Sequence, residues 1–271
     1  MKKHLSTILL VIIFIIGLSL LLYPTFSDWW NSMHQSYAIA NYDAAMADLK
    51  EEDYTSLFAA AEKYNEEIKQ IDFPLMYHEE VAGYYDILDV SGTGIIGYID
   101  IDKIDVELPI YHGTSEGVLQ IAVGHLEGTT LPIGGAGTHA ALSAHRGLPS
   151  ARLFTDLDKM ELGDTFTITV LDRLLTYEVD QILIVEPHDV EALYVVEGED
   201  LVTLVTCTPY GINSHRMLVR GHRIENAEEV KVVRVTADAV QIEPVIVAPF
   251  VAAPMLLILL IILMIPKKKK K

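Results

Sequence analysis

The chain has 271 residues, one cysteine and a formal net charge of −18 at pH 7. Seven of its 20 Lys and Arg lie in the two terminal tails, which leaves 13 basic against 38 acidic residues from Pro24 to Pro244. A surface this acidic argues against binding of nucleic acid or anionic lipid, because such binders present Lys and Arg to phosphates. A single cysteine allows no internal disulfide, so the thiol is either idle or kept for chemistry.

Two uncharged apolar stretches lie near the ends of the chain, at residues 5–23 and 245–265. Each is long enough to cross a lipid bilayer as a helix, which takes about 20 residues. Lysines flank both stretches on their outer sides, and this predicts two transmembrane helices, both termini in the cytoplasm and the middle of the chain outside the cell membrane. A cleaved signal peptide is the alternative for the first stretch, since a basic start and an apolar core also describe one.

Residues 24–71 are expected to be helical. After the aromatic pair Trp29 and Trp30, which suits a membrane interface, Ala, Leu, Glu and Lys dominate, and apolar residues recur at roughly helical spacing. We expect two helices that form a stalk or a layer packed against the following domain. Residues 72–93 contain Pro74, Gly83 and Gly92, and their apolar residues follow no helix or strand periodicity. They are expected to be a loop, either a plain linker or a possible lid over a site.

From Gly94 onward the chain consists of short β-type runs broken by Gly and Pro. Eight strand candidates occur: IIGYIDI, VELPIYH, VLQIAVG, THAALSAH, TFTITVL, LTYEVDQILIV, LVTLVT and RMLVRGHRI. They predict a mainly β fold, an antiparallel or mixed eight-stranded barrel at residues 94–226, with short connecting helices near 151–157 and 189–194. The remaining segments are a cytoplasmic N-terminus at 1–4, a C-terminal extension at 227–244 and a basic cytoplasmic tail at 266–271.

Cys207 and Arg216 stand at facing ends of two of these runs. The run LVTLVT delivers the thiol to its end, and the next run begins with the guanidinium after a loop rich in Pro, Gly and Asn. A nucleophilic thiolate needs a nearby base or cation, and a tetrahedral oxyanion needs a preorganised donor such as Arg. The alternative interpretation is that Cys207 is a buried small hydrophobe, which is common for a free cysteine.

His145 is the best candidate for the base among ten histidines. It closes the run THAALSAH and opens a turn, so it can project into a groove shared with a cysteine at the end of another strand. His215 is the local competitor, but it is adjacent to Arg216, and adjacent strand residues point to opposite faces. No histidine pair has a compact metal-binding spacing and no second cysteine helps, so no metal is expected.

Two long stretches resemble the signature blocks of sortases, specifically the class C, pilus-building branch. They are SAHRGLPSARLFTDLDKM at 143–160 and TLVTCTPYGINSHRMLVRGHR at 203–223, and residues 96–147 continue the likeness. The resemblance implies a sortase-type barrel in which Cys207 is the nucleophile, His145 the acid or base and Arg216 the group that positions substrate and oxyanion. It implies no cofactor, and Arg220 and Arg223 are interpreted as structural or surface residues.

The resemblance also implies a reaction and its partners. A class C sortase cleaves an LPxTG-type sorting signal and joins the resulting acyl group to a lysine of the next pilin subunit, so the expected partners are pilin subunits or surface proteins with such a signal. Many class C sortases have a lid with an Asp-Pro-aromatic motif. Here the only similar run is Asp72-Phe73-Pro74, with the order changed, and this puts a lid of the usual kind in doubt.

Three other functions fit parts of this pattern. A housekeeping sortase would use a cell-wall amine as acceptor, and a plain cysteine peptidase would use water. A non-catalytic β-domain, acting as an adhesin or receptor, would not need the thiol at all.

Overall fold

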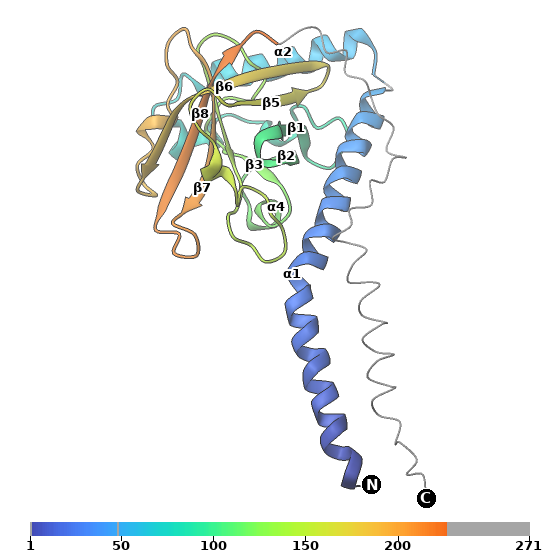
Figure 1. Cartoon of the computed structure of the whole chain (residues 1–271). Coiled ribbons are helices and arrows are strands. Elements are labelled where there is room, and N and C mark those ends of the chain that lie inside the picture. The colour runs from blue at the N-terminus through green and yellow to red at the C-terminus, as the bar shows by residue number, and fades with distance from the viewer. Residues whose placement is uncertain (1, 48, 227–271) are drawn as a thin grey trace, which may run out of the picture.

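The computed structural model describes residues 2–47 and 49–226 (Figure 1). Its α-helices are α1 (Lys2–Ala47), α2 (Glu51–Ile68), α3 (Pro74–Tyr77) and α4 (Glu116–Leu119). Its strands are β1 (Ile95–Ile101), β2 (Val106–His112), β3 (Val123–His125), β4 (Thr138–Ser143), β5 (Thr165–Val170), β6 (Arg173–Val185), β7 (Asp200–Thr208) and β8 (His215–Ile224). Short 3₁₀ helices are η1 (His78–Glu80), η2 (Tyr84–Asp86), η3 (Asp102–Ile104), η4 (Leu157–Lys159) and η5 (Glu191–Leu193).

The eight strands form a closed barrel in the order β1-β2-β3-β4-β7-β8-β6-β5. Two neighbouring pairs, β2 with β3 and β4 with β7, are parallel, and the other pairs are antiparallel. The predicted eight-stranded barrel is therefore confirmed. The expected helix at 189–194 contains η5, whereas η4 begins only at the last residue of the stretch expected at 151–157.

The third predicted strand, VLQIAVG, was wrong in its first half. Val118 and Leu119 belong to the short helix α4, and only Val123 onward pairs with neighbouring strands. The Ser115 side chain explains the start of this helix, because its hydroxyl oxygen accepts the Val118 N–H at 3.5 Å. A local cap thus overrides the β-type composition.

The barrel has two apolar layers with different roles. Its interior is the main core, filled by alternate strand residues that include Ile99, Leu142, Leu204 and Val219, all fully buried. A smaller cluster covers the outer face of β4, β7 and β8, and its buried members are Ala141, Leu193, Val205 and Leu218. The outer cluster lies on the face that carries the candidate site.

Helix α1 runs without interruption through the predicted anchor at 5–23 and past Pro24 (Figure 1). Among the described residues it is the one helix long and apolar enough to cross a membrane. The second predicted transmembrane helix, 245–265, lies outside the described residues, as do the extension at 227–244 and the tail at 266–271. The expectation of two spans therefore still rests on the sequence.

The C-terminal half of α1 is docked on the barrel. Tyr42 is fully buried, and its hydroxyl donates to the Ile96 carbonyl at 3.1 Å and accepts the Leu171 N–H at 2.9 Å. Asn31 and Gln35 lie about one helical turn apart on α1. Asn31 donates to the Ser150 carbonyl at 2.7 Å, and Gln35 donates to the Ile121 carbonyl at 2.7 Å. Of the two alternatives for residues 24–71, the packed layer describes this helix better than a free stalk.

Residues 72–93, expected as a loop, contain the short turns α3, η1 and η2. The second half of the segment is built into the protein, since Tyr84 and Leu88 are buried. The Tyr84 hydroxyl lies 2.8 Å from His125 Nδ1 and accepts the Gly113 N–H at 2.9 Å. This half is therefore a packed element rather than a plain linker.

Candidate active site

Strand register brings the three predicted site residues to one rim of the barrel. In the parallel pair of β4 and β7, Ser143 lies beside Val205, so His145 and Cys207, each two residues further on, come to the same rim. In the antiparallel hairpin of β7 and β8, Cys207 lies directly opposite Arg216. Strand residues two apart share a face and paired residues share a face, so all three side chains belong to the outer face.

Thr206 fixes the spacing between the thiol and the histidine. It is 1% exposed, and its hydroxyl donates to the Ala144 carbonyl at 2.8 Å, while the Ala144 N–H donates to the Val205 carbonyl at 3.1 Å. These two bonds extend the parallel pairing past the last ladder residue of β4. Thr206 is not among the residues predicted for the site from the sequence. Its position immediately before the cysteine was the available signal.

The loops that follow the two strands also contact each other. A Cβ added to Gly147 would lie 2.9 Å from the Tyr210 ring, so only glycine fits where these two loops meet. Arg146 pairs with Asp158, and its Nη1 lies 3.4 Å from the Thr208 hydroxyl oxygen. The turn after His145 is thus held against the turn after Cys207.

Each of the three side chains is partly open to solvent. Cys207 is a free thiol of intermediate exposure, and the His145 side chain is 27% exposed. Arg216 Nη1 donates to the His215 carbonyl at 3.1 Å and to the Asn213 carbonyl at 3.3 Å, which orients the guanidinium at the rim. A half-exposed thiol, an imidazole and a held guanidinium on one face can support nucleophilic acyl transfer.

A family model described as "Sortase domain" matches residues 99–224. The structure is similar to the crystal structure of sortase C1 from Streptococcus agalactiae, with 48% sequence identity, a TM-score of 0.64 and coverage of 70% of this chain and 99% of that chain. The chain belongs to the sortase family. Sortases are cysteine transpeptidases, and class C sortases are among this chain's structural neighbours.

Other relatives agree with this assignment. Sortase C of Streptococcus pneumoniae is 44% identical, with a TM-score of 0.63 and coverage of 70% of this chain and 97% of that chain. A curated "Sortase A" of Streptococcus agalactiae is 32% identical over 117 residues, which are 42% of this chain and 47% of the relative. A "Sortase D" of Bacillus subtilis is 28% identical over 131 residues, 47% of this chain and 63% of the relative. This sortase thus spans 47% and 63% of the length of these two curated relatives.

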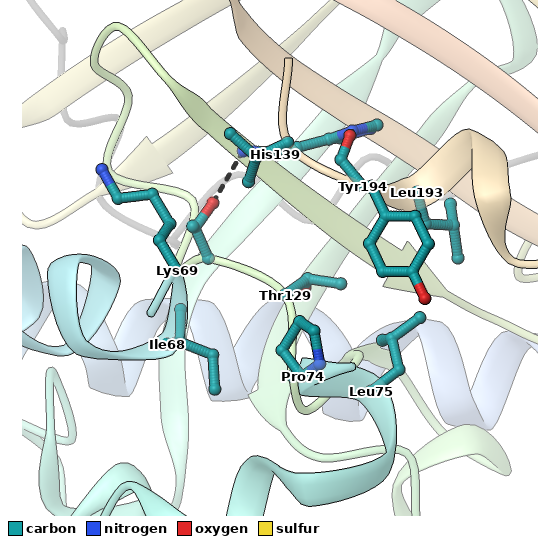
Figure 2. Close-up of a pocket in the computed structure, with 11 residues that line it drawn as sticks. Ile68, Lys69, Pro74, Leu75, Thr129, His139, Leu193 and Tyr194 are labelled. Atoms are coloured by element: carbon teal, nitrogen blue, oxygen red, sulfur yellow. Dashed lines mark hydrogen bonds between the residues drawn. The ribbon is translucent and has the colours of Figure 1, made fainter. Parts of the chain in front are cut away.

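The outer face of this sortase is closed at the end far from the thiol. There α3, the turn at Gly128–Thr130 and the β6–β7 connection at Leu193–Val195 meet over His139 and enclose a cavity of about 20 Å³, room for a water molecule (Figure 2). A Cβ added to Gly128 would lie 2.5 Å from the Pro74 carbonyl oxygen, so α3 lies directly against the barrel. Phe73, the aromatic residue of the reordered lid motif, is 65% exposed.

His139 belongs to this closed end and is fully engaged. Its Nδ1 donates to the Tyr194 carbonyl at 2.9 Å, so its Nε2 accepts from the Thr203 hydroxyl at 2.7 Å. It is 1% exposed, and burial lowers its pKa below the ordinary value. The neutral ring ties the β6–β7 connection to the sheet, which is a structural role.

The remaining sequence candidates lie apart from the thiol. His215 lies opposite Thr208, and its Nδ1 is 2.8 Å from the Ser214 hydroxyl. Arg220 makes two bonds of 2.9 Å to Asp180, and Arg223 donates to the Thr176 carbonyl at 3.0 Å. Within residues 2–47 and 49–226, no group of three or more His, Cys, Asp or Glu is placed to hold a metal ion.

Proposed function

We propose that this chain is a membrane-anchored sortase that cleaves an LPxTG-type sorting signal and joins pilin subunits through lysine isopeptide bonds. The observation that carries the proposal is the shared rim of His145, Cys207 and Arg216, which the β4–β7 and β7–β8 registers produce. Cys207 and Arg216 come from β7 and β8, His145 follows the end of β4, and each has the chemistry that one role in acyl transfer needs.

In the first half-reaction the Cys207 thiolate attacks the carbonyl carbon of the Thr residue in the sorting signal. Arg216 donates hydrogen bonds to the oxyanion that develops on this carbonyl oxygen. The C–N bond to the following Gly then breaks, and protonated His145 gives its proton to the leaving amine. The products are a thioester on Cys207 and the released C-terminal fragment.

In the second half-reaction a lysine amine of the next pilin subunit attacks the thioester carbonyl. His145, now neutral, accepts the proton that the amine loses. The carbon–sulfur bond breaks, the thiolate returns, and an amide bond joins the two subunits. Each step balances without a cofactor or a metal ion.

The outer apolar cluster is suited to hold the substrate. Val205 lies two residues before Cys207 on the same face, and Ala141 and Leu218 flank it on neighbouring strands. This apolar strip leads from the thiol toward the closed end, its three residues are buried, and we infer that the Leu and Pro of an LPxTG segment pack beside it in an extended form. We infer that α3 limits the length of this strip. A lid mutant is among the solved structures of the Streptococcus agalactiae enzyme, which is 45% identical to this chain.

Support for a pilin substrate comes from the relatives. The structure of Streptococcus pneumoniae sortase C concerns pilin substrate specificity, and that enzyme is 44% identical to this chain. Membrane anchoring supports the same function. A barrel held near the lipid by α1, and by a second span at 245–265, meets pilin precursors that are retained by their own apolar tails at a raised effective concentration.

Mass spectrometry of acyl intermediates tests the proposal. The full-length chain in detergent is incubated with an LPxTG peptide, beside a Cys207→Ala control, and then with a pilin domain that carries the acceptor lysine. The expected result is a covalent adduct of the peptide's N-terminal part, absent from the control and transferred to the lysine. Release only to water indicates a peptidase, and transfer only to a cell-wall amine indicates a housekeeping sortase. Absence of any adduct favours a non-catalytic domain.

A further inference from the structure

Helix α4 lies beside the histidine of the site because of how β3 and β4 pair. These strands are antiparallel, with Gly124 opposite Ser143, so the start of β3 is next to the end of β4. Helix α4 ends at Leu119, shortly before β3 begins, and therefore occupies the same rim as His145. There Glu116 Oε1 lies 3.8 Å from His145 Nε2.

The Glu116 carboxylate is held at this place by its own helix and by α1. The Gln120 side-chain amide donates to Glu116 Oε1 at 2.5 Å. The residue after Gln120 is fixed from the other side, since Gln35 of α1 donates to the Ile121 carbonyl at 2.7 Å. A side chain that is 73% exposed is thus oriented toward the imidazole rather than left free in solvent.

His145 Nε2 is the atom that this carboxylate faces, and it needs a partner. It is enclosed, and within the described part of the chain it has no hydrogen-bond partner. His125 and His139, by contrast, have both ring nitrogens engaged. Buried polar atoms in native proteins are rarely left unpaired. A shift of the Glu116 carboxylate by about 1 Å would shorten the 3.8 Å separation between its Oε1 and His145 Nε2 to hydrogen-bond length.

We propose that Glu116 is a positioning residue for His145: its carboxylate pairs with Nε2, orients the ring and favours the imidazolium form. The proposal rests on the role assigned to His145 above. The strand registers also place Cys207 of β7 and Arg216 of β8 at the rim that carries the ring, while the adjacent Arg146 is paired with Asp158. The imidazolium is the form that stabilises the thiolate and protonates the leaving amine. Glu116 therefore raises the fraction of enzyme molecules that are ready to react.

The size of the effect follows from exposure. An ion pair at a partly solvated rim is screened by water and salt, so removal of the carboxylate weakens catalysis without abolishing it. We expect Glu116→Gln to lower kcat/KM for an LPxTG peptide about fivefold, with a larger change in kcat than in KM. The pH–rate profile of the variant is expected to differ from that of the parent chain on its alkaline limb.

The experiment compares the full-length chain in detergent with two variants of equal net charge. Glu116→Gln keeps the shape of the side chain and an acceptor for Gln120, and Glu62→Gln removes one exposed carboxylate from α2 as the control. Two readouts are taken across pH, turnover of the peptide and the rate at which iodoacetamide alkylates Cys207. The second readout needs no substrate. We expect slower alkylation of Glu116→Gln at pH 6 to 7 and no change for Glu62→Gln.

The two readouts separate this proposal from the function on which it rests. If the alkylation profile of Glu116→Gln coincides with that of the parent chain, Glu116 has no role at His145 and the proposal is overturned. A uniform loss of turnover at all pH values would also overturn it, because it would indicate a structural effect. If the alkylation profile shifts while no peptide is transferred by the parent chain, Glu116 keeps its role and transpeptidation is what fails.

Discussion

Two histidines on one strand face show how different the two ends of the outer face of the barrel are. His139 and His145 lie six residues apart on β4 and just beyond it, about 20 Å along an extended strand. Both ring nitrogens of His139 are engaged and the ring is 1% exposed, whereas His145 is 27% exposed with an unpaired Nε2. Residue type and strand face are the same at both ends, and the completeness of hydrogen bonding separates the structural histidine from the one proposed for catalysis.

The surroundings of the two ends explain this contrast. At the His139 end, α3 and the β6–β7 connection cover the sheet (Figure 2). Tyr84 anchors the segment after α3 on His125. At the His145 end, strands stop and loops turn away, so side chains keep access to solvent. Substitutions at the open end should therefore affect activity, and substitutions at the closed end should affect stability.

The largest expected effect is that of Cys207→Ala at the open end. Loss of the nucleophile should reduce peptide transfer at least ~1000-fold, since no other described group can form the thioester. The melting temperature should change by no more than about 2 °C, because the thiol is half-exposed and unpaired. Peptide turnover and a thermal melt measure both outcomes. A large loss of stability would show that the thiol belongs to the scaffold.

Arg216→Ala should come next, with a decrease of ~100-fold to ~1000-fold in kcat for peptide transfer. Arg216→Lys should recover only part of this, because an ammonium lacks the planar fork of the guanidinium. Arg220→Gln is the matched control, since Arg220 lies on the same strand face and is paired with Asp180. Steady-state kinetics should show a change of less than about threefold for this control. Equal losses for both arginines would contradict the assignment.

At the closed end His125 should make stability depend on pH. Burial lowers its pKa to about 4 from the ordinary 6.5, and its Nε2 donates to the Thr130 carbonyl while Nδ1 accepts from Tyr84. The unfolded chain binds the proton first, so this contribution is present above pH 6.5 and is lost as the pH falls from 6.5 to 4, by about 3 kcal/mol in all.

Thermal melts between pH 4 and 8 test the role of His125. The parent chain should lose stability as the pH falls through this window, and His125→Gln should be less stable at pH 7 but show a flatter curve. An unchanged slope in His125→Gln would mean that another group titrates.

Gly128→Ala should loosen the closed end. A Cβ there would lie 2.5 Å from the Pro74 carbonyl oxygen at a φ of +89°, so α3 has to move away. We expect faster proteolytic cleavage within residues 72–77. We also expect a twofold to fivefold rise in peptide turnover, because α3 is inferred to limit the length of the apolar strip that holds the substrate. Gly83→Ala is the control, because it has a similar φ of +85° and no atom within 4 Å of the added Cβ. Equal proteolysis of both variants would assign the effect to backbone strain alone.

The smallest change in stability is expected at Asp100 on β1, away from both ends of the outer face. Burial and the nearby Asp102, Glu107 and Asp105 raise its pKa to about 6. The folded protein therefore binds this proton more tightly than the unfolded chain, and the associated stability is lost as the pH rises from about 4 to 6. Asp100→Asn should raise stability by about 1 kcal/mol at pH 7, after allowance for solvent screening, and by nothing near pH 4. Thermal melts at both pH values measure the difference.

Local patterns in the sequence determined much of this protein. The β-type runs predicted the barrel strands, and the hairpin of β7 and β8 places Arg216 opposite Cys207 because the two residues are close along the chain. The resemblance to sortases named the same residues together with His145. Two predictions from local pattern were wrong. The third β-type run begins as the helix α4, because Ser115 caps it. The predicted anchor and the helix after it are one continuous helix, since α1 continues through Pro24.

Only the tertiary structure decided the environment of the site. A parallel pairing across 62 residues brings His145 to the same rim as Cys207, and a parallel pair has no connecting turn that a sequence can reveal. The contact of Glu116 with His145, the bond from Thr206 to Ala144 and the contact of α3 with Gly128 each join distant segments. Alternation in a strand specifies which face a residue occupies, whereas the residues that cover that face are specified by how the closed barrel packs.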